Sequence, residues 1–265
     1  MNFSVYNNYP IGQVYPVVSP NANSYRPIRP QNDSVSFSGE LNHFLNKQTL
    51  TEMVNANPVI KKMFAEKGLK PVIDVDNFKK TTYKHSLETR DNAMGIYHYL
   101  PIDLKQEANI KHIQKGAMLH DIGKVLIPTK ILNKNGALSP EECEIMHMHS
   151  KLSDALLSSQ NIEPEVLNIV KYHHQNKQGT GYPEIKNTLK GFDINTEIVA
   201  VADKFSALKE QRAYKQALSD NEALDIIKKD VEKGNINPRV YNALVGFVNS
   251  KTAVLEQTRS TAAIA

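Results

Sequence analysis

Apolar residues recur at helical spacing along most of the chain. Ile110, Ile113 and Ala117 are separated by three and four positions, so they share one face of a helix. Helix starts can also be recognised, because Ser139 and Ser219 each precede a glutamate by three positions, which is the pattern of a capping box. We find neither an alternating strand pattern nor an internal repeat. The sequence therefore predicts an all-α fold.

The pattern divides the chain into four parts. Residues 1–38 lack helical periodicity and contain five of the 13 prolines, which fix φ and remove a backbone donor, so we predict a disordered leader. Residues 39–75 can form two or three short helices and are predicted to be a small accessory segment. Residues 76–250 should form the main helical bundle, in which one long helix runs from about residue 77 to residue 100. Residues 251–265 are predicted to be a C-terminal tail.

Seven titratable residues interrupt the apolar faces of the predicted helices. His149 follows Ile145 by four positions and precedes Leu152 by three, so it should point inward with them. His147 is rotated by about 200° from His149 at about 100° per residue, and should face solvent as an ordinary surface residue. The complete set, drawn from five helices, is His85, His120, Asp121, His149, His173, His174 and Asp203.

Burying five imidazoles and two carboxylates is costly unless something binds them. A pair of divalent cations would do so, since seven ligands are too many for one ion. Imidazole and carboxylate ligands without thiolate favour first-row metals such as Fe, Mn, Ni or Co, with Zn also allowed. Two ions about 3.5–4 Å apart can hold a hydroxide between them and bind both non-bridging oxygens of a phosphoryl group. The residues thus predict hydrolysis of a phosphate ester.

Composition narrows the class of protein further. The 265 residues suffice for one or two domains, and the net charge of +4 is scattered along the chain, which disfavours a nucleic-acid polymer as the partner. The single cysteine, Cys143, excludes an intramolecular disulfide framework and a cysteine-rich zinc site. No apolar run reaches the roughly 18–20 residues of a membrane span, and no secretory signal is evident. We therefore predict a cytoplasmic protein that makes no membrane contact.

Several motifs resemble those of one known family. Residues 120–124 read HDIGK and are similar to the motif of the metal-dependent HD phosphohydrolases. Residues 173–183 read HHQNKQGTGYP and resemble the signature of the HD-GYP subfamily, and residues 201–215 resemble a later block of that subfamily. His149 lies where the subfamily has an intermediate histidine. The resemblance covers roughly residues 77–250 and rests on several motifs in the same order.

This resemblance implies an all-helical bacterial phosphodiesterase that acts in signal transduction. Such enzymes hydrolyse the second messenger cyclic di-GMP to the linear dinucleotide pGpG and, in some members, to GMP. The resemblance also implies how the ligands are shared. One metal would be held by His85, His120, Asp121 and Asp203, and the second by His149, His173 and His174, with Asp121 as the bridge.

Further roles follow from the same resemblance. Lys124 would stand near the scissile phosphate and stabilise charge in the transition state, which makes Asp121 and Lys124 the predicted catalytic residues. Arg212 and Lys215 match positions that contact the phosphates or guanines of the substrate, and Tyr182 belongs to the loop that borders the pocket. The predicted reaction is attack on phosphorus by a hydroxide that bridges the two ions. The sequence does not identify the proton donor for the leaving oxygen.

The sequence departs from the subfamily pattern at a few positions. Gln175 and Gln178 replace acidic residues that are common in the signature. Thr81 stands where some members carry a glutamate that helps to hold a third ion, so we expect two metals rather than three. Ser206 and Ala213 replace an aspartate and a proline, and are interpreted as structural differences. All seven predicted ligands are present, which favours an active enzyme.

Two alternatives are left open. The first is an HD phosphohydrolase that acts on another nucleotide, which a panel of substrates would distinguish. The second is a non-catalytic sensor or adaptor that binds a cyclic dinucleotide or a protein partner and signals through residues 1–75. The regulatory input and the oligomeric state, including a homodimer or a separate signalling partner, are not indicated by the sequence.

Overall fold

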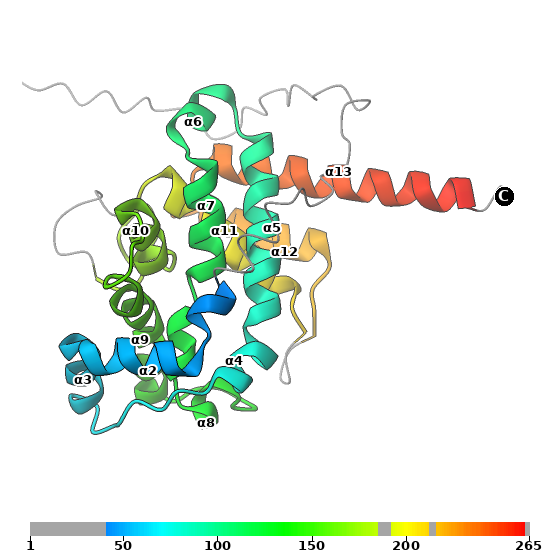
Figure 1. Cartoon of the computed structure of the whole chain (residues 1–265). Coiled ribbons are helices and arrows are strands. Elements are labelled where there is room, and N and C mark those ends of the chain that lie inside the picture. The colour runs from blue at the N-terminus through cyan, green and yellow to red at the C-terminus, as the bar shows by residue number, and fades with distance from the viewer. Residues whose placement is uncertain (1–40, 185–191, 212–215, 263–265) are drawn as a thin grey trace, which may run out of the picture.

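Helices make up every regular element in the described part of the computed structural model, which covers residues 41–184, 192–211 and 216–262. The predicted all-α fold is therefore confirmed for these residues (Figure 1). The longer helices are α2 (Lys47–Ala56), α3 (Pro58–Ala65), α4 (Val75–Thr81), α5 (Tyr83–Tyr99), α6 (Ile102–Glu107), α7 (Ile110–Leu119), α9 (Pro140–Leu157), α10 (Pro164–Tyr172), α11 (Ile194–Lys209), α12 (Asp220–Glu232) and α13 (Pro238–Ala262). A 3-10 helix, Ile122–Leu126, and the short α8, Thr129–Leu132, join α7 to α9.

The buried apolar side chains form two clusters. The first cluster is built by α2, α3, the 3-10 helix and α9, and the second by α5, α11, α12 and α13. Helices α7 and α10 contribute to both, because Met118 and Val170 face the first cluster whereas Ala117 and Ile169 face the second. These two helices therefore form the wall that the two apolar clusters share.

The N-terminal helices are part of the first cluster. Leu41, Leu50 and Ile60 have no exposed surface, and they pack in the same cluster as α9 residues such as Leu152. The side-chain amide of Asn57, which lies between α2 and α3, donates to the carbonyl of Ala155 at 2.6 Å. This region was predicted to be an accessory segment, but it completes the core on which α9 rests.

The ends of the chain bear on two other predictions. The predicted leader, residues 1–38, lies outside the described residues. The predicted tail contains the last turns of α13, which continues to Ala262 and extends to one side of the bundle in Figure 1. No helix in the described ranges is both long and apolar enough to cross a membrane.

The long helix predicted over residues 77–100 is divided in two. Helix α4 ends at Thr81 and α5 begins at Tyr83, with Thr82 between them at φ −118° and ψ −31°. Two consecutive β-branched threonines disfavour a regular helix at this point, because their χ1 freedom is restricted against the preceding turn. The division leaves α5 as a separate helix whose first turn carries His85.

The helix starts agree with the sequence pattern. Ser139 accepts from the backbone of Glu142 at 3.2 Å, and the Glu142 carboxylate accepts from the backbone of Ser139 at 2.7 Å. Ser219 and Glu222 form the same reciprocal pair at the start of α12. Both predicted capping boxes are confirmed. The first of them fixes the start of α9, the helix that carries His149.

A buried serine joins the turn after α7 to α9. The Ser153 hydroxyl donates to the carbonyl of His120 at 2.9 Å and accepts from the backbone of Gly123 at 2.8 Å. The approach is close, since a Cβ on Gly123 would lie 2.2 Å from the carbonyl oxygen of His149. The chain around His120 and Asp121 is thus held directly against α9.

We expect Ser153→Ala to destabilise the fold by about 1–3 kcal/mol, because it leaves a buried donor and a buried acceptor unpaired. Urea unfolding followed by circular dichroism measures this loss. Ser150→Ala is the matched control, since Ser150 is buried on the same helix but its hydroxyl donates only within α9, to the carbonyl of His147 at 3.3 Å. Equal losses in the two variants would contradict the role assigned to Ser153.

Candidate metal centre

The seven predicted ligands meet between the two apolar clusters. His85 comes from α5, His120 and Asp121 from the end of α7, His149 from α9, His173 and His174 from the end of α10, and Asp203 from α11. Six of them are buried, with relative exposures between 0% and 8%, and His174 is half-buried. The structure therefore brings together residues that are up to 118 positions apart in the sequence.

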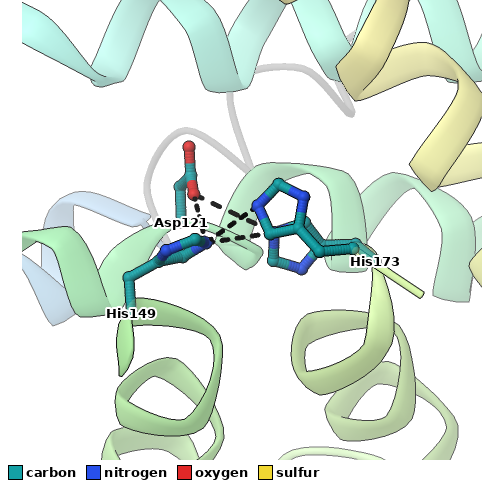
Figure 2. A group of neighbouring side chains, drawn as sticks. Asp121, His149 and His173 are labelled. Carbon is teal, nitrogen blue, oxygen red and sulfur yellow. Dashed lines mark hydrogen bonds and ion pairs between the residues drawn. The ribbon is translucent and has the colours of Figure 1, made fainter. Parts of the chain in front are cut away.

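One group of ligands surrounds the first carboxylate oxygen of Asp121. Figure 2 shows Asp121, His149 and His173 approaching one another from separate elements of the chain. The Nε2 atom of His149 lies 3.3 Å from Asp121 Oδ1, and that of His173 lies 4.0 Å from it. His174 joins this group, because its Nε2 is 3.1 Å from Nε2 of His149. These four side chains offer ligand atoms to a single point.

A second group faces the other oxygen of Asp121. Nε2 of His120 lies 3.2 Å from Asp121 Oδ2, and Nε2 of His85 lies 3.8 Å from the same oxygen. Asp203 contributes through Oδ1, which is 2.8 Å from His85 Nε2 and 3.7 Å from His120 Nε2. Asp121 thus presents a different oxygen to each group of imidazoles.

Backbone hydrogen bonds fix the orientation of three imidazoles. The Nδ1 atom of His120 lies 2.7 Å from the carbonyl of Ala117. In the same way, Nδ1 of His149 lies 2.7 Å from the carbonyl of Met146, and Nδ1 of His173 lies 2.8 Å from that of Val170. Each carbonyl lies three residues before its histidine, at the same turn of the helix. Because a carbonyl only accepts, each Nδ1 carries the proton and Nε2 is left to face the centre, as in many metal-binding histidines.

Electrostatics divides the histidines into two kinds. Burial lowers the pKa of His149 to about 4, and burial together with the neighbouring His120 and His149 lowers the pKa of His173 to about 3. These two imidazoles are therefore neutral at pH 7, the form in which imidazole binds metal. Burial opposes protonation of His120 as well, but the carboxylates of Asp121 and Asp203 outweigh it and raise its pKa to about 10.

The two carboxylates are ionised. Burial favours the neutral acid, yet His120 and Lys124 hold the pKa of Asp121 well below its usual range, and His120 and His85 do the same for Asp203. Lys124 forms the closest contact, with Nζ 2.6 Å from Asp121 Oδ2. Two negative charges are thus buried beside a protonated His120 and the neutral imidazoles of His149 and His173.

The donor set fits divalent cations. Within the described residues, Nε2 of His120 and Oδ1 of Asp121 are buried without a hydrogen-bond partner. Nε2 of His149 also lies 3.4 Å from Nε2 of His173, so the lone pairs of two neutral rings point at each other. A cation between such atoms removes the repulsion and satisfies the unpaired groups, whereas an unfilled cluster of this kind is costly. The His and Asp side chains of this cluster can therefore hold metal.

The predicted substrate contacts lie partly within the described residues. Lys124 adjoins the cluster through Asp121, as given above. The Tyr182 ring lies 4.5 Å from the ring of His174, between ring centroids, and burial raises the pKa of its hydroxyl, which is therefore protonated. Arg212 and Lys215 fall outside the described residues.

Other side chains near the cluster were not among the predicted site residues. His147 was predicted to be an ordinary surface residue; it is exposed, but its ring stacks on Tyr182 with centroids 3.8 Å apart. Gln175 is buried and donates to the carbonyl of Pro183 at 2.7 Å. Helical periodicity could not reveal either contact, since both depend on where the Gly181–Pro183 turn folds back. Thr81, which replaces an acidic residue of the family pattern, donates to the carbonyl of Asn77 within α4 at 2.8 Å.

Comparison with known proteins identifies relatives of this chain. The family model described as HD domain matches residues 83–240. The chain is 29% identical over 173 residues to a protein of Vibrio cholerae named 3'3'-cGAMP-specific phosphodiesterase 1, covering 64% of this chain and 39% of that protein. It is 43% identical over 112 residues to a protein of Thermotoga maritima named cyclic di-GMP phosphodiesterase, covering 41% of this chain and 30% of that protein.

A solved structure supports the fold. An HDG"Y"P protein from Bdellovibrio bacteriovorus superimposes with a TM-score of 0.52 at 16% sequence identity, over 81% of this chain and 64% of that one. At this identity the likeness concerns the helical fold alone. The curated relatives are longer than the region they share with this chain, which spans less than half of either of them.

We expect Mn²⁺ to raise the melting temperature of the protein, because an ion that binds only the folded state adds about 2.7 kcal/mol at a hundredfold excess over its dissociation constant. Asp121→Asn should lose most of this stabilisation, since it removes the charge that both groups of imidazoles face. Asp225→Asn, at an exposed position on α12, is the control and should respond to Mn²⁺ like the unmodified chain. Differential scanning fluorimetry with and without EDTA measures all three. An unchanged Mn²⁺ response in Asp121→Asn would contradict the assignment.

Proposed function

The chain belongs to the HD domain family, and we propose that it is a metal-dependent phosphodiesterase that hydrolyses cyclic di-GMP to pGpG, to GMP or to both. The observation that carries this proposal is the position of Asp121, whose two oxygens face two separate groups of imidazoles. A carboxylate shared in this way is suited to a pair of ions.

We assign the ligands to two divalent ions, with iron or manganese as the expected metals. His85, His120, Asp121 and Asp203 would hold one ion, and His149, His173 and His174, with Asp121 as the bridge, the other. The absence of thiolate from this donor set supports first-row metals. When bound, a pair of such ions supplies water of lowered pKa and positive charge for the oxygens of a phosphoryl group.

The residues of the chain prepare the site for that chemistry. The hydrogen bonds at Nδ1 hold the rings of His120, His149 and His173 with Nε2 inward, so these rings need no rotation before an ion binds. Lys124 forms an ion pair with Asp121 and can place its positive charge next to a phosphate that approaches the cluster. A fixed charge at this position would stabilise the negative charge that develops in the transition state.

The open side of the cluster supports a substrate larger than a single phosphate. His174 has 24% of its side chain exposed, Lys124 17% and Asp203 11%, whereas the side chains of His120 and His173 are fully buried. Tyr182 lies next to His174 on this side. A phosphodiester can approach the ligands here while the rest of a dinucleotide remains outside the apolar core.

A second candidate substrate is 3′,3′-cyclic GMP–AMP. The Vibrio cholerae relative is named for that cyclic dinucleotide, whereas the Thermotoga maritima relative is named for cyclic di-GMP. The two substrates share the phosphodiester ring and differ in one base, so the metal ligands do not distinguish them. Specificity between them would depend on side chains around the opening.

Protein purified anaerobically and loaded with Mn²⁺ or Fe²⁺ should convert cyclic di-GMP to pGpG or GMP, with about two metals per chain. Chromatography of the products and metal analysis of the same sample measure both quantities. A panel with 3′,3′-cyclic GMP–AMP and other phosphorylated nucleotides identifies the preferred substrate. Two bound metals without turnover of cyclic di-GMP would contradict the proposed substrate, and absence of both metal and turnover would indicate a protein that acts by binding.

Lys124→Ala should lower kcat by about 10²–10³, because it removes one preorganised charge from the transition state. Lys130→Ala is the control: Lys130 lies six residues further along the chain and is exposed, so its loss should leave kcat unchanged. Steady-state kinetics at saturating metal separates the two variants. Equal activity of Lys124→Ala and the unmodified enzyme would remove Lys124 from the catalytic residues.

A further inference from the structure

The most parallel pair of aromatic rings in the described part of the chain lies beside the metal centre. The rings of His147 and Tyr182 have centroids 3.8 Å apart and planes inclined by 16°. The next ring beside Tyr182 is that of His174, at 4.5 Å and 34°. The Tyr182 ring therefore contacts both an exposed histidine of α9 and a predicted ligand of the second metal.

The backbone under Tyr182 is fixed without His147. The Gln175 side chain donates to the carbonyl of Pro183 at 2.7 Å and accepts from the backbone of Gly181 at 3.0 Å. The backbone of Tyr182 itself donates to the carbonyl of His174 at 3.2 Å. Both ends of the turn are thus held by the residues that follow α10. These backbone bonds do not fix the side-chain torsions of Tyr182, so they leave the orientation of its ring free.

The ring direction matters because of where Tyr182 lies. The side chain of His174 is more exposed than those of His149 and His173, so the cluster opens on the side where His174 lies. A Tyr182 ring held against His174 forms one edge of that opening. A ring that turned away would leave the edge unformed and His174 more exposed.

We propose that His147 is a positioning residue that holds the Tyr182 ring against His174 and so shapes the edge of the opening that receives the substrate. The expected effect of His147 on turnover rests on the proposed function. The expected effect of His147 on the orientation of the Tyr182 ring does not. His147 acts through a stacked ring rather than through a proton. Another flat ring at position 147 should therefore replace it, and a small polar residue should not.

The first test observes the ring without any substrate. The chain contains no tryptophan, so Tyr182→Trp introduces a single fluorescent reporter at the stacked position. Adding His147→Ser should raise the acrylamide quenching constant at least about twofold, because an unstacked ring is more accessible. Adding His147→Phe should restore the low value, and His98→Ser, at an exposed histidine of α5, should leave it unchanged. Equal quenching in the serine and phenylalanine variants would overturn the proposal.

The second test uses the natural Tyr182 and the Mn²⁺-loaded enzyme. His147→Ser should raise KM for cyclic di-GMP about five- to tenfold, with a smaller change in kcat, and His147→Phe should restore KM. Tyr182→Ala should raise KM at least as much, and combining it with His147→Ser should add nothing, because residues that act through one contact are not additive. Additive losses in the double variant would overturn the proposal.

The two tests separate this proposal from the proposed function. If cyclic di-GMP is not hydrolysed but bis(p-nitrophenyl) phosphate is, the substrate assignment is wrong, and the quenching series still decides whether His147 holds the ring. The quenching series can behave as expected while KM for the preferred substrate is the same with serine and with phenylalanine at position 147. In that case His147 packs on Tyr182 without shaping the edge of the opening that receives the substrate, and the proposal fails. Mn²⁺-dependent stabilisation of His147→Ser confirms that the variant folds.

Discussion

The burial of two carboxylates among five imidazoles is the constraint around which the bundle is organised. Asp121 and Asp203 are ionised inside the protein, where Lys124 pairs with Asp121 and a protonated His120 lies beside both carboxylates. Such a cluster would be destabilising as an ordinary part of a core, because unpaired polar atoms and facing lone pairs are costly in a medium of low dielectric. A folded protein can contain such a cluster only where the stabilisation from apolar packing on both sides exceeds the free-energy cost of burying it. The two hydrophobic clusters, joined by α7 and α10, supply that packing.

The backbone near the cluster shows how the ligands are kept in place. His120, His149 and His173 each bond to the carbonyl three residues earlier, so the helix that carries the ligand also orients it. The turn after α7 is tied to α9 by Ser153, which fixes His120 relative to His149. These contacts relate the ligands of the two groups to one another before any ion binds. Preorganised ligands bind metal without paying for their own ordering.

The sequence was informative where a residue's direction depends on its own helix. His149 points inward because of its spacing from Ile145 and Leu152, and the capping boxes mark the helix starts. Prediction was weaker where the burial or contact of a residue depends on which other part of the chain packs against its helix. The helices before residue 66 looked peripheral from their modest apolar content, yet Leu41 and Ile60 are fully buried. His147 does face outward, as its spacing indicates, but Tyr182 of the Gly181–Pro183 turn stacks on it, and the periodicity of α9 cannot predict where that turn lies.

The hydrogen bonds of Gln175 explain what a glutamine does at a position where the family pattern commonly has an acidic residue. An ionised acid at this position could accept from the backbone of Gly181 but could not donate to the carbonyl of Pro183, whereas the amide does both. The glutamine also removes one negative charge from the neighbourhood of Asp121 and Asp203. The turn that carries Tyr182 is therefore held by neutral hydrogen bonds, which do not compete electrostatically with the ligands for a cation. The negative charge of the cluster thus remains on its two buried carboxylates, and the turn beside it is held by uncharged groups.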